Sequence, residues 1–345
     1  MRGLAAGAYL LLGCLSLTAA SGAETTGQEL AETASRGLVG APAPKLLLTT
    51  IDGQNIDLGA LYGKQAVYLK FWATWCVPCR QQMPHLEHTF DTAGPDLAVI
   101  AIDVGFGDSL DAVRTLRQQI GLSMPIVFDR DGQLGAAFNL RVTPQHIVIG
   151  RDGRIQYIGH LADERLDAAL VAARRPWNEP EQSRGAGARA VTAAAHFGVG
   201  DSLPAQSAAL LGGQSFEFQR AHEHRPTVFV FLSPWCESYL ATTRPDVSSS
   251  CRIAREQMTA LADDGRARWL GIASGLWAKR EDLVKYQQKY QVTVPLTLDA
   301  SGTLFREFRV NDVPTIIIAD SHGKIVQRVE PSDAHSLKKA LAALM

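Results

Sequence analysis

The 345-residue sequence has few cysteines, few aromatic residues and almost no net charge. Its 34 lysines and arginines are balanced by 35 aspartates and glutamates, so the net charge is -1. Without an excess of basic residues, the chain lacks the surface with which proteins bind nucleic acids or anionic lipids. Five cysteines are too few to staple a chain of this length, so their positions matter more than their number. Hydrophobic residues at 46% and charged residues at 20% indicate a globular protein, and the length indicates two domains.

The first 23 residues have the pattern of a secretory signal peptide. Arg2 supplies a positive charge, residues 9–17 form a short apolar run, and Ser21-Gly22-Ala23 offers the small residues of a cleavage site. A lipid anchor at Cys14 is the less favoured alternative, because the residues after it stay apolar. No later apolar run is long enough to span a membrane. We therefore expect a soluble periplasmic or otherwise exported protein, in a compartment where cysteine pairs form disulfides.

The remaining chain divides into two ordered blocks. A polar segment precedes the first block, and an aperiodic stretch rich in arginine, proline and glycine separates the two. The predicted organisation is a flexible lead-in over residues 24–37, a first domain over 38–173, a linker over 174–195 and a second domain over 196–345.

The two blocks repeat one another. Each contains a β-rich run that ends at a Trp-Cys pair, and Asp299 and Pro314 follow Asp129 and Pro144 by 170 positions. Within each block, apolar strands alternate with amphipathic helices and a hairpin closes the unit. This order predicts an α/β fold of two tandem domains, each a mixed β-sheet flanked by helices. The predicted helices include 77–92, 110–120, 132–139 and 163–173 in the first block, and 280–290, 303–308 and 334–344 in the second.

Cys76-Val77-Pro78-Cys79 follows a strand and opens a helix. Residues three apart lie on one helical face, so the two sulfurs can form a disulfide. The free N–H groups and the dipole at a helix N-terminus lower the pKa of a thiol, which makes Cys76 the expected nucleophile and Cys79 the resolving thiol. A zinc site would need more ligands than the sequence groups here, and a structural bridge across so short a loop adds little stability. The motif predicts redox chemistry that needs neither a cofactor nor a metal.

Residues 70–84, with the sequence Lys-Phe-Trp-Ala-Thr-Trp-Cys-Val-Pro-Cys-Arg-Gln-Gln-Met-Pro, resemble the active-site segment of thioredoxin-like protein disulfide reductases of the TlpA/ResA type. The resemblance implies two thioredoxin-like domains, a helix kinked at Pro84, and a cis peptide bond at Thr143-Pro144 facing the disulfide. It implies protein substrates with disulfides, among them cytochrome c apoprotein, and a membrane-embedded thiol-relay protein as electron donor. The expected site residues are Lys70, Trp75, Cys76, Cys79, Thr143 and Pro144.

Two positions depart from the family pattern. Lys70 stands where thioredoxins proper carry a buried acid, and Gln82 stands where many reductases of this type carry a glutamate. Either the ammonium of Lys70 stabilises the Cys79 thiolate and raises the reduction potential, or it extends to water. A protein-disulfide reductase is the favoured function, and a thiol oxidase that forms disulfides is the alternative.

The second block keeps the Trp-Cys pair at Cys236 but has Tyr239 in place of the second cysteine. Cys251, 15 positions after Cys236, is a candidate partner, and the pair can be redox-active or structural. Pro314 is the counterpart of the first cis-proline. A thiol peroxidase is a further alternative, with Arg244 or Arg252 as the cation beside Cys236. A docking role without chemistry is another.

Overall fold

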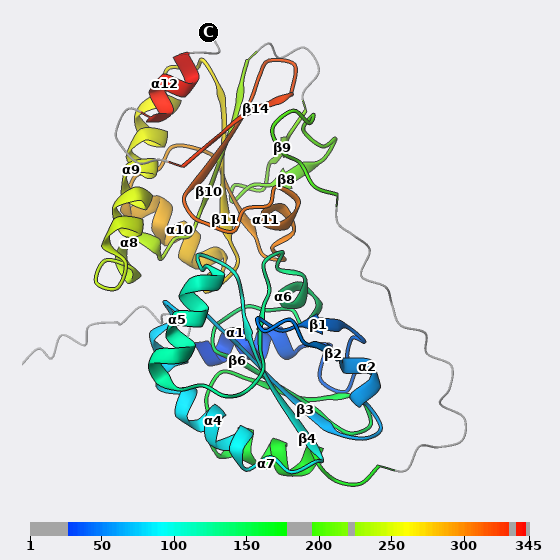
Figure 1. Ribbon diagram of the computed structural model, residues 1–345. Helices are drawn as coiled ribbons and strands as arrows, with labels where there is room; N and C mark the ends of the chain where they lie inside the picture. Colours follow the sequence, from blue (N-terminus) through cyan, green and yellow to red (C-terminus); the bar gives the residue numbers. More distant parts are fainter. Residues whose placement is uncertain (1–26, 178–194, 220–224, 331–335, 343–345) are drawn as a thin grey trace, which may run out of the picture.

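The computed structural model describes residues 27–177, 195–219, 225–330 and 336–342. The predicted signal peptide and most of the predicted linker lie outside these residues. The described chain forms two five-stranded sheets, each with helices around it, and they lie one above the other in Figure 1. We call the parts built on these sheets the first and the second domain.

The first sheet has the strand order β5-β4-β3-β6-β7. Its central strand β3 is buried at every residue, as expected for a strand covered on both faces. Strands β3, β4 and β5 are parallel, whereas β6 and β7 run antiparallel to their neighbours. The strands are β3 (Ala66–Trp72), β4 (Leu97–Asp103), β5 (Ile126–Phe128), β6 (Gln145–Ile149) and β7 (Ile155–Gly159), and the helices are α1 (Gly27–Ser35), α2 (Leu58–Leu61), α3 (Val77–Gln81), α4 (Met83–Asp91), α5 (Leu110–Ile120), α6 (Gln133–Ala137) and α7 (Glu164–Ala173).

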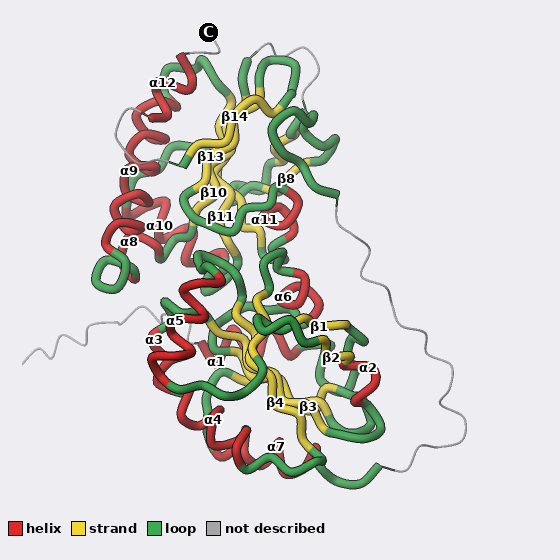
Figure 2. The backbone as a smooth tube through the Cα atoms, in the orientation of Figure 1, coloured by secondary structure: helices red, strands yellow, loops and turns green. Residues whose placement is uncertain are grey.

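The second sheet repeats the first, with the order β12-β11-β10-β13-β14 and the same pattern of parallel and antiparallel neighbours. The predicted repeat and the α/β fold class are therefore confirmed. Figure 2 shows the strands of each domain as a yellow core between red helices. The strands are β10 (Thr227–Leu232), β11 (Arg268–Ser274), β12 (Leu296–Asp299), β13 (Thr315–Ala319) and β14 (Ile325–Val329), and the helices are α8 (Cys236–Tyr239), α9 (Pro245–Ala262), α10 (Arg280–Lys289), α11 (Thr303–Glu307) and α12 (Ser336–Ala342).

A small antiparallel hairpin precedes each sheet, and the sequence patterns did not predict either one. In the first domain it pairs β1 (Leu47–Thr49) with β2 (Asn55–Asp57), and in the second it pairs β8 (Ser207–Ala209) with β9 (Ser215–Glu217). Each strand is three residues long and partly exposed, so it carries too little alternation to give a pattern.

The predicted flexible lead-in over residues 24–37 is wrong for the part that the structure describes. Gly27–Ser35 forms helix α1, which packs beside β7. Leu30, Ala31 and Ala34 share one face of this helix and are buried, because residues three and four apart lie on one side. The helix therefore belongs to the first domain.

The single helix predicted over residues 77–92 is two helices. It breaks at Gln82, whose backbone leaves the helical region with φ -97° and ψ 3°, and α4 then begins with Pro84 in its first turn. A proline has no N–H to donate and fits a first turn, so it favours a new helix start at this point. The kink implied at Pro84 is thus a complete break one turn after Cys79.

The extra residues of the second domain after Cys236 also form helices. The insertion contains the short α8 and the 18-residue α9, which the sequence patterns did not predict. Cys251 lies on the buried side of α9, so the insertion packs as part of the second domain.

Candidate active site at the Cys76–Cys79 disulfide

Cys76 and Cys79 form a disulfide at the beginning of α3, and both are fully buried. Cys76 is the N-cap residue of this helix, and the backbone N–H of Cys79 donates to the Cys76 sulfur at 3.2 Å. A donor aimed at the sulfur, together with the positive end of the helix, stabilises a thiolate at Cys76 when the disulfide is reduced. The geometry matches that expected for an attacking cysteine.

The Thr143-Pro144 peptide bond is cis, as the family resemblance implies, and it lies against the disulfide. The sulfur of Cys76 is 3.4 Å from the carbonyl oxygen of Thr143. β6 begins directly after this proline and pairs with β3, so the sheet holds the loop and the Trp-Cys segment together. Two segments far apart in the sequence thereby form one site.

The loop that leads into Cys76 is held by an acidic pair that the sequence analysis missed. Asp108 accepts from the backbone N–H of Thr74 at 2.7 Å and from the Thr74 hydroxyl. Asp103 is buried at the end of β4 and accepts from the N–H of Gly105. Burial raises the pKa of both carboxyls. The ring nitrogen of Trp75 donates to the Phe106 carbonyl at 2.8 Å, which fixes the indole beside the disulfide.

Lys70 lies beneath the site and is fully buried. Its ammonium nitrogen is 3.4 Å from the carbonyl oxygen of Cys79, to which it donates. Burial lowers the pKa of Lys70 to about 7, because the charged form loses its hydration. The alternative in which the side chain extends to water is wrong, since the side chain does not reach the surface.

A buried polar network joins the break between α3 and α4 to the cis-proline loop. His146 on β6 contacts the hydroxyl of Tyr68 through Nδ1 at 2.7 Å and Oε1 of Gln82 through Nε2 at 2.8 Å. The amide of Gln82 donates to the carbonyl of His160 at 3.3 Å, and Nδ1 of His160 is 2.7 Å from the carbonyl of Pro144. The sequence analysis noted Gln82 only as a missing carboxylate.

The protonation state of His146 follows from its neighbours. Burial, aided by the nearby Lys70, lowers the pKa of His146, so its imidazole is neutral. Burial raises the pKa of Tyr68, so its hydroxyl keeps its proton and donates to Nδ1. The imidazole N–H at Nε2 then donates to Oε1 of Gln82, because an amide oxygen only accepts. Every hydrogen bond of the ring is satisfied with no net charge.

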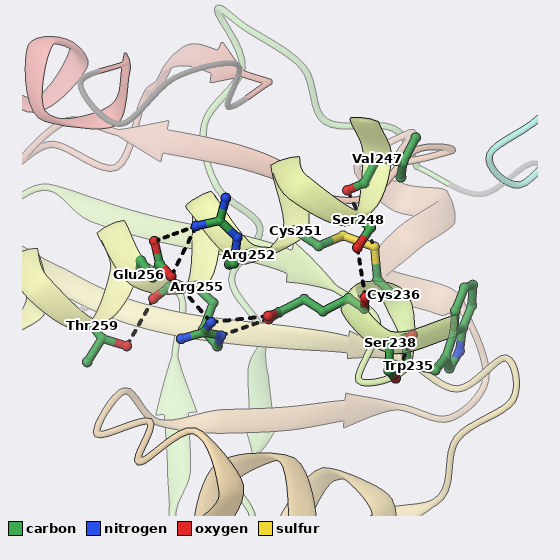
Figure 3. A network of polar contacts seen from close by, with 11 residues as sticks. Trp235, Cys236, Ser238, Val247, Ser248, Cys251, Arg252, Arg255, Glu256 and Thr259 are labelled. Carbon is green, nitrogen blue, oxygen red and sulfur yellow. Dashed lines mark hydrogen bonds and ion pairs between the residues drawn. A yellow bond between two sulfur atoms is a disulfide. The ribbon is translucent and has the colours of Figure 1, made fainter. Parts of the chain in front are cut away.

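The second domain contains the Cys236–Cys251 disulfide, which links α8 to α9 (Figure 3). Cys236 is fully buried and Cys251 nearly so. The sulfur of Cys236 lies 3.9 Å from the carbonyl oxygen of Val247, and no backbone N–H donates to it among the described residues. This sulfur therefore lacks the donor that Cys76 receives. The Val313-Pro314 bond of this domain is cis, as predicted.

Two further contacts tie α8 to α9 beside that disulfide. Arg255 forms a two-pronged ion pair with Glu237, at 2.7 and 3.1 Å, and both side chains are largely buried. The hydroxyl of Ser248 donates to the Glu237 carbonyl at 2.7 Å. Figure 3 shows the Arg255 contact and the disulfide at successive turns of α9. Three connections thus fix the same pair of helices.

The two arginines considered for peroxide chemistry have other partners. Arg252 contacts Glu256 and Ser249 on its own helix, and the guanidinium of Arg244 donates to the Gly107 carbonyl of the first domain. Neither contact brings a cation to the Cys236 sulfur.

The two domains meet through the ends that carry their Trp-Cys pairs. Trp75 and Trp235 stack with ring centroids 5.3 Å apart, and the Tyr239 hydroxyl accepts from the N–H of Val77 at 3.3 Å. Tyr239 occupies the place of the second cysteine in its own domain. It therefore contacts the first turn of α3, beside Cys76.

The contact has approximate two-fold symmetry that follows the sequence repeat. The N–H of Gly107 donates to the carbonyl of Asn311 at 2.6 Å, and the N–H of Trp277 donates to the carbonyl of Arg141 at 2.9 Å. Trp277 and Asn311 follow Gly107 and Arg141 by the same 170 positions that relate the two domains. Each domain thus offers the same loop to the segment before the other's cis-proline.

A cavity of about 250 Å³ lies at this contact on the side of the second cis-proline. Trp75, Phe106 and Gly107 line it from the first domain. The second domain contributes Trp235, Leu240, Arg244, Asp246, Val247, Ser250, Asp312, Val313, Pro314 and Glu330.

The sheet order and the helix-capping disulfide beside a cis-proline place the protein in the thioredoxin-like class. A profile of the AhpC/TSA family matches residues 39–158. The chain is 31% identical over 135 residues to the thiol-disulfide oxidoreductase ResA of Bacillus thuringiensis (strain Al Hakam), a match that covers 38% of this chain and 76% of that protein. The protein belongs to the family of ResA-like thiol-disulfide oxidoreductases, which have the thioredoxin-like fold.

Other proteins are also similar to part of this chain. ResA of Bacillus subtilis is 31% identical over 117 residues, covering 34% of this chain and 64% of that protein. Among solved structures, StoA from Bacillus subtilis matches 37% of this chain and 97% of its own, with 25% identity and a TM-score of 0.34. A putative protein disulfide isomerase from Bacteroides thetaiotaomicron matches 39% of this chain and 86% of its own, with 30% identity and a TM-score of 0.34. Within the described residues, no helix has the length and apolarity needed to cross a membrane.

Proposed function

We propose that this oxidoreductase is an exported protein-disulfide reductase that uses Cys76 and Cys79. The observation that carries the proposal is the N–H of Cys79, which donates to the Cys76 sulfur at the start of α3. Such a donor stabilises the thiolate, which is the form of cysteine that attacks disulfides.

The reaction proceeds in two exchanges. The Cys76 thiolate attacks one sulfur of the substrate disulfide, which forms a mixed disulfide and releases the other substrate sulfur as a thiolate that takes up a proton. The Cys79 thiol then loses its proton, attacks the Cys76 sulfur and releases the second substrate thiol. Two electrons pass to the substrate, and Cys76–Cys79 is left oxidised.

The surrounding residues support these steps. Thr143 and Pro144 provide the edge along which the substrate chain docks next to Cys76, as an added strand does at a sheet edge. Trp75 fixes the loop that carries the nucleophile. Lys70 stabilises the thiolate of Cys79 when charged and accepts its proton when neutral, since a pKa of about 7 makes both forms accessible.

Continued turnover requires electrons from outside the protein. In an oxidising compartment, a membrane-embedded thiol-relay protein is the donor that fits, and cytochrome c apoprotein is a substrate of the expected kind. Export rests on the signal-peptide pattern of residues 1–23. N-terminal sequencing of the protein from the exported fraction should begin at Glu24, and retention of Met1 would contradict export.

A thiol oxidase is the second candidate, and the position of the Lys70 amine, 3.4 Å from the carbonyl oxygen of Cys79, favours it. A positive charge beside Cys79 stabilises the reduced form and raises the reduction potential, which suits the transfer of a disulfide to other proteins. The resting state in the cell separates the two directions. A reductase keeps Cys76 and Cys79 reduced, whereas an oxidase keeps them bridged, and alkylation before lysis followed by mass spectrometry reads this state.

Insulin reduction by the full chain tests the proposed reductase directly. Cys76→Ser should abolish it, and Cys79→Ser should accumulate a mixed disulfide whose mass identifies the partner in the cell. The matched control is the double variant Cys236→Ser/Cys251→Ser, which leaves the first site intact. Full activity of this control assigns the second domain, over residues 196–345, to docking or regulation. Persistent activity without Cys76 would overturn the proposed site.

A further inference from the structure

Trp277 of the second domain occupies the edge of the first domain at which a substrate would dock. Its backbone N–H donates to the carbonyl of Arg141 at 2.9 Å, and its ring nitrogen donates to the hydroxyl of Thr143 at 3.1 Å. The indole also meets the ring of His160 edge to face, with centroids 5.3 Å apart. The two acceptors, the Arg141 carbonyl and the Thr143 hydroxyl, belong to the three residues that precede Pro144.

The pocket around the indole is apolar on its other side. Leu30 and Ala31 of α1 form a buried cluster with Val142, and Trp277 packs against it. The pocket therefore combines an apolar wall with one hydroxyl acceptor and one backbone carbonyl acceptor. Such a lining suits an aromatic side chain that has a hydrogen-bond donor, on an extended chain.

The backbone of Trp277 indicates that its side chain is held there for a reason. Its φ is +59°, in the left-handed region that favours glycine and is costly for a bulky residue. The equivalent residue of the first domain is Gly107, with a φ of +64°. The same turn thus forms without a side chain in one domain, and the tryptophan is not needed to make it.

The two sides of the contact differ accordingly. Beside Pro314, Gly107 contributes no side chain, and the cavity of about 250 Å³ remains open. Beside Pro144, the symmetry-related position carries the indole of Trp277. The chain fills the cleft next to the catalytic disulfide and leaves its counterpart empty.

We infer that the pocket between α1, Thr143 and His160 is a binding site for an aromatic residue of the protein substrate, and that Trp277 occupies it until the substrate displaces it. The inference rests on the proposed function and adds the class of substrate: an extended polypeptide with tryptophan or tyrosine near its cysteine. The substrate's N–H replaces that of Trp277 at Arg141, and its ring replaces the indole.

Displacement must also uncover the sulfur. Cys76 is fully buried, and Tyr239 covers the first turn of α3 through its contact with Val77. A substrate that reaches Cys76 therefore separates this part of the second domain from the first. Only substrate chains that bind tightly enough to displace Trp277 and Tyr239 therefore reach Cys76.

The test uses Trp277→Gly in the full chain, because glycine relieves the positive φ and reproduces the residue at the equivalent position. The rate at which dithiothreitol reduces Cys76–Cys79 is followed by alkylation and mass spectrometry. We expect this rate to rise about tenfold over wild type, which is the effect of losing about one net hydrogen bond and its ring contact. Trp177→Gly, which removes a tryptophan outside this contact, should leave the rate unchanged. Equal rates for wild type and Trp277→Gly would overturn the covering role.

The aromatic site is tested with a short extended peptide that has one tryptophan and no cysteine, and with the same peptide carrying alanine. In Trp277→Gly, the tryptophan peptide should slow reduction by dithiothreitol at least threefold and the alanine peptide should not; equal effects of the two peptides would overturn the site. Trp277→Asn, which also tolerates a positive φ, replaces Trp277→Gly should that variant not fold. This readout needs no reductase activity, so failure of insulin reduction alone counts only against the proposed function.

Discussion

Trp75 and Trp235 stack across the contact between the two domains, with their ring planes inclined by 27°. Each indole donates to a carbonyl of its own domain at 2.8 Å, Trp75 to Phe106 and Trp235 to Leu276. Because each ring is fixed before it meets the other, little side-chain entropy is lost when they stack. The residue before each first cysteine therefore forms the centre of the domain contact.

The stacking predicts a measurable coupling between these two tryptophans. Trp75→Ala and Trp235→Ala should each lower the free energy of unfolding, and the double variant should lose about 1 kcal/mol less than their sum. Urea unfolding followed by circular dichroism gives the four values of the cycle. As a control, Trp75→Ala and Trp269→Phe should be additive, because Trp269 lies in a separate hydrophobic cluster. Additivity of the stacked pair would mean that the rings contribute independently.

Burial of Lys70 predicts how stability depends on pH. In the folded protein its pKa is lowered to about 7, whereas an unfolded lysine has a pKa of about 10.4. Between these values the unfolded chain holds a proton that the folded chain lacks, so stability rises with pH across this window and the gain is absent below pH 7.

The measurement compares wild type with Lys70→Met, in which this dependence is absent. The stability of wild type relative to the variant should increase by up to about 1.4 kcal/mol per pH unit between pH 7 and 10. Lys64→Met, at an exposed lysine of the same domain, should show no such slope. A difference between wild type and Lys70→Met that stays flat over this range would show that Lys70 remains charged in the folded protein.

Local patterns were sufficient for the α/β fold class, the repeat and the centre of the site, although they missed α1, α9 and the two small hairpins. Helix α5 has the predicted bounds, because Ser109 caps its start, Gly121 ends it and its apolar residues keep helical spacing. The cysteine spacing and the family resemblance located Cys76, Cys79 and the cis bond at Pro144. These features depend on residues close together in the sequence, or on a repeat that the sequence contains twice.

The missed polar contacts of the site depend on residues far apart. Tyr68 and His146 are 78 positions apart. Each lies in an apolar strand, and their contact becomes apparent only when β3 and β6 are paired. Trp277 and Thr143 are 134 positions apart and lie in different domains. A strand pattern says which face is buried, but it does not say which polar groups meet there. Only the sheet register and the domain contact supply that information.

The contacts of His146 predict that replacing it lowers the free energy of unfolding, and that a second substitution at Tyr68 recovers part of the loss. His146→Leu leaves the buried hydroxyl of Tyr68 without its acceptor and Oε1 of Gln82 without its donor, so the free energy of unfolding should fall by about 2–4 kcal/mol. Adding Tyr68→Phe removes the stranded hydroxyl and should recover about 1 kcal/mol. The exposed His88→Leu is the control and should change stability little. A double variant less stable than His146→Leu would mean that Tyr68 has another partner.

The last prediction concerns the division of work between the two disulfides. Both first cysteines have a carbonyl oxygen near the sulfur, but among the described residues only the Cys76 sulfur also receives a backbone N–H, from Cys79. A hydrogen-bond donor stabilises a thiolate, so reduction is easier at the first pair. The second bridge also closes a longer loop, 15 positions against 3, so its removal costs more folding stability.

We therefore expect Cys236–Cys251 to stay bridged at dithiothreitol concentrations that fully reduce Cys76–Cys79. Structural disulfides have reduction potentials below about -300 mV, and the second pair should fall in that range. Titration with alkylation and mass spectrometry measures both pairs in one sample. Cys236→Ser/Cys251→Ser should lose about 3 kcal/mol of stability, with α8 still held to α9 by Arg255 and Ser248. If both pairs were reduced at one potential, or exchanged electrons, the second domain would be a redox partner of the first domain. Its bridge would then not be purely structural.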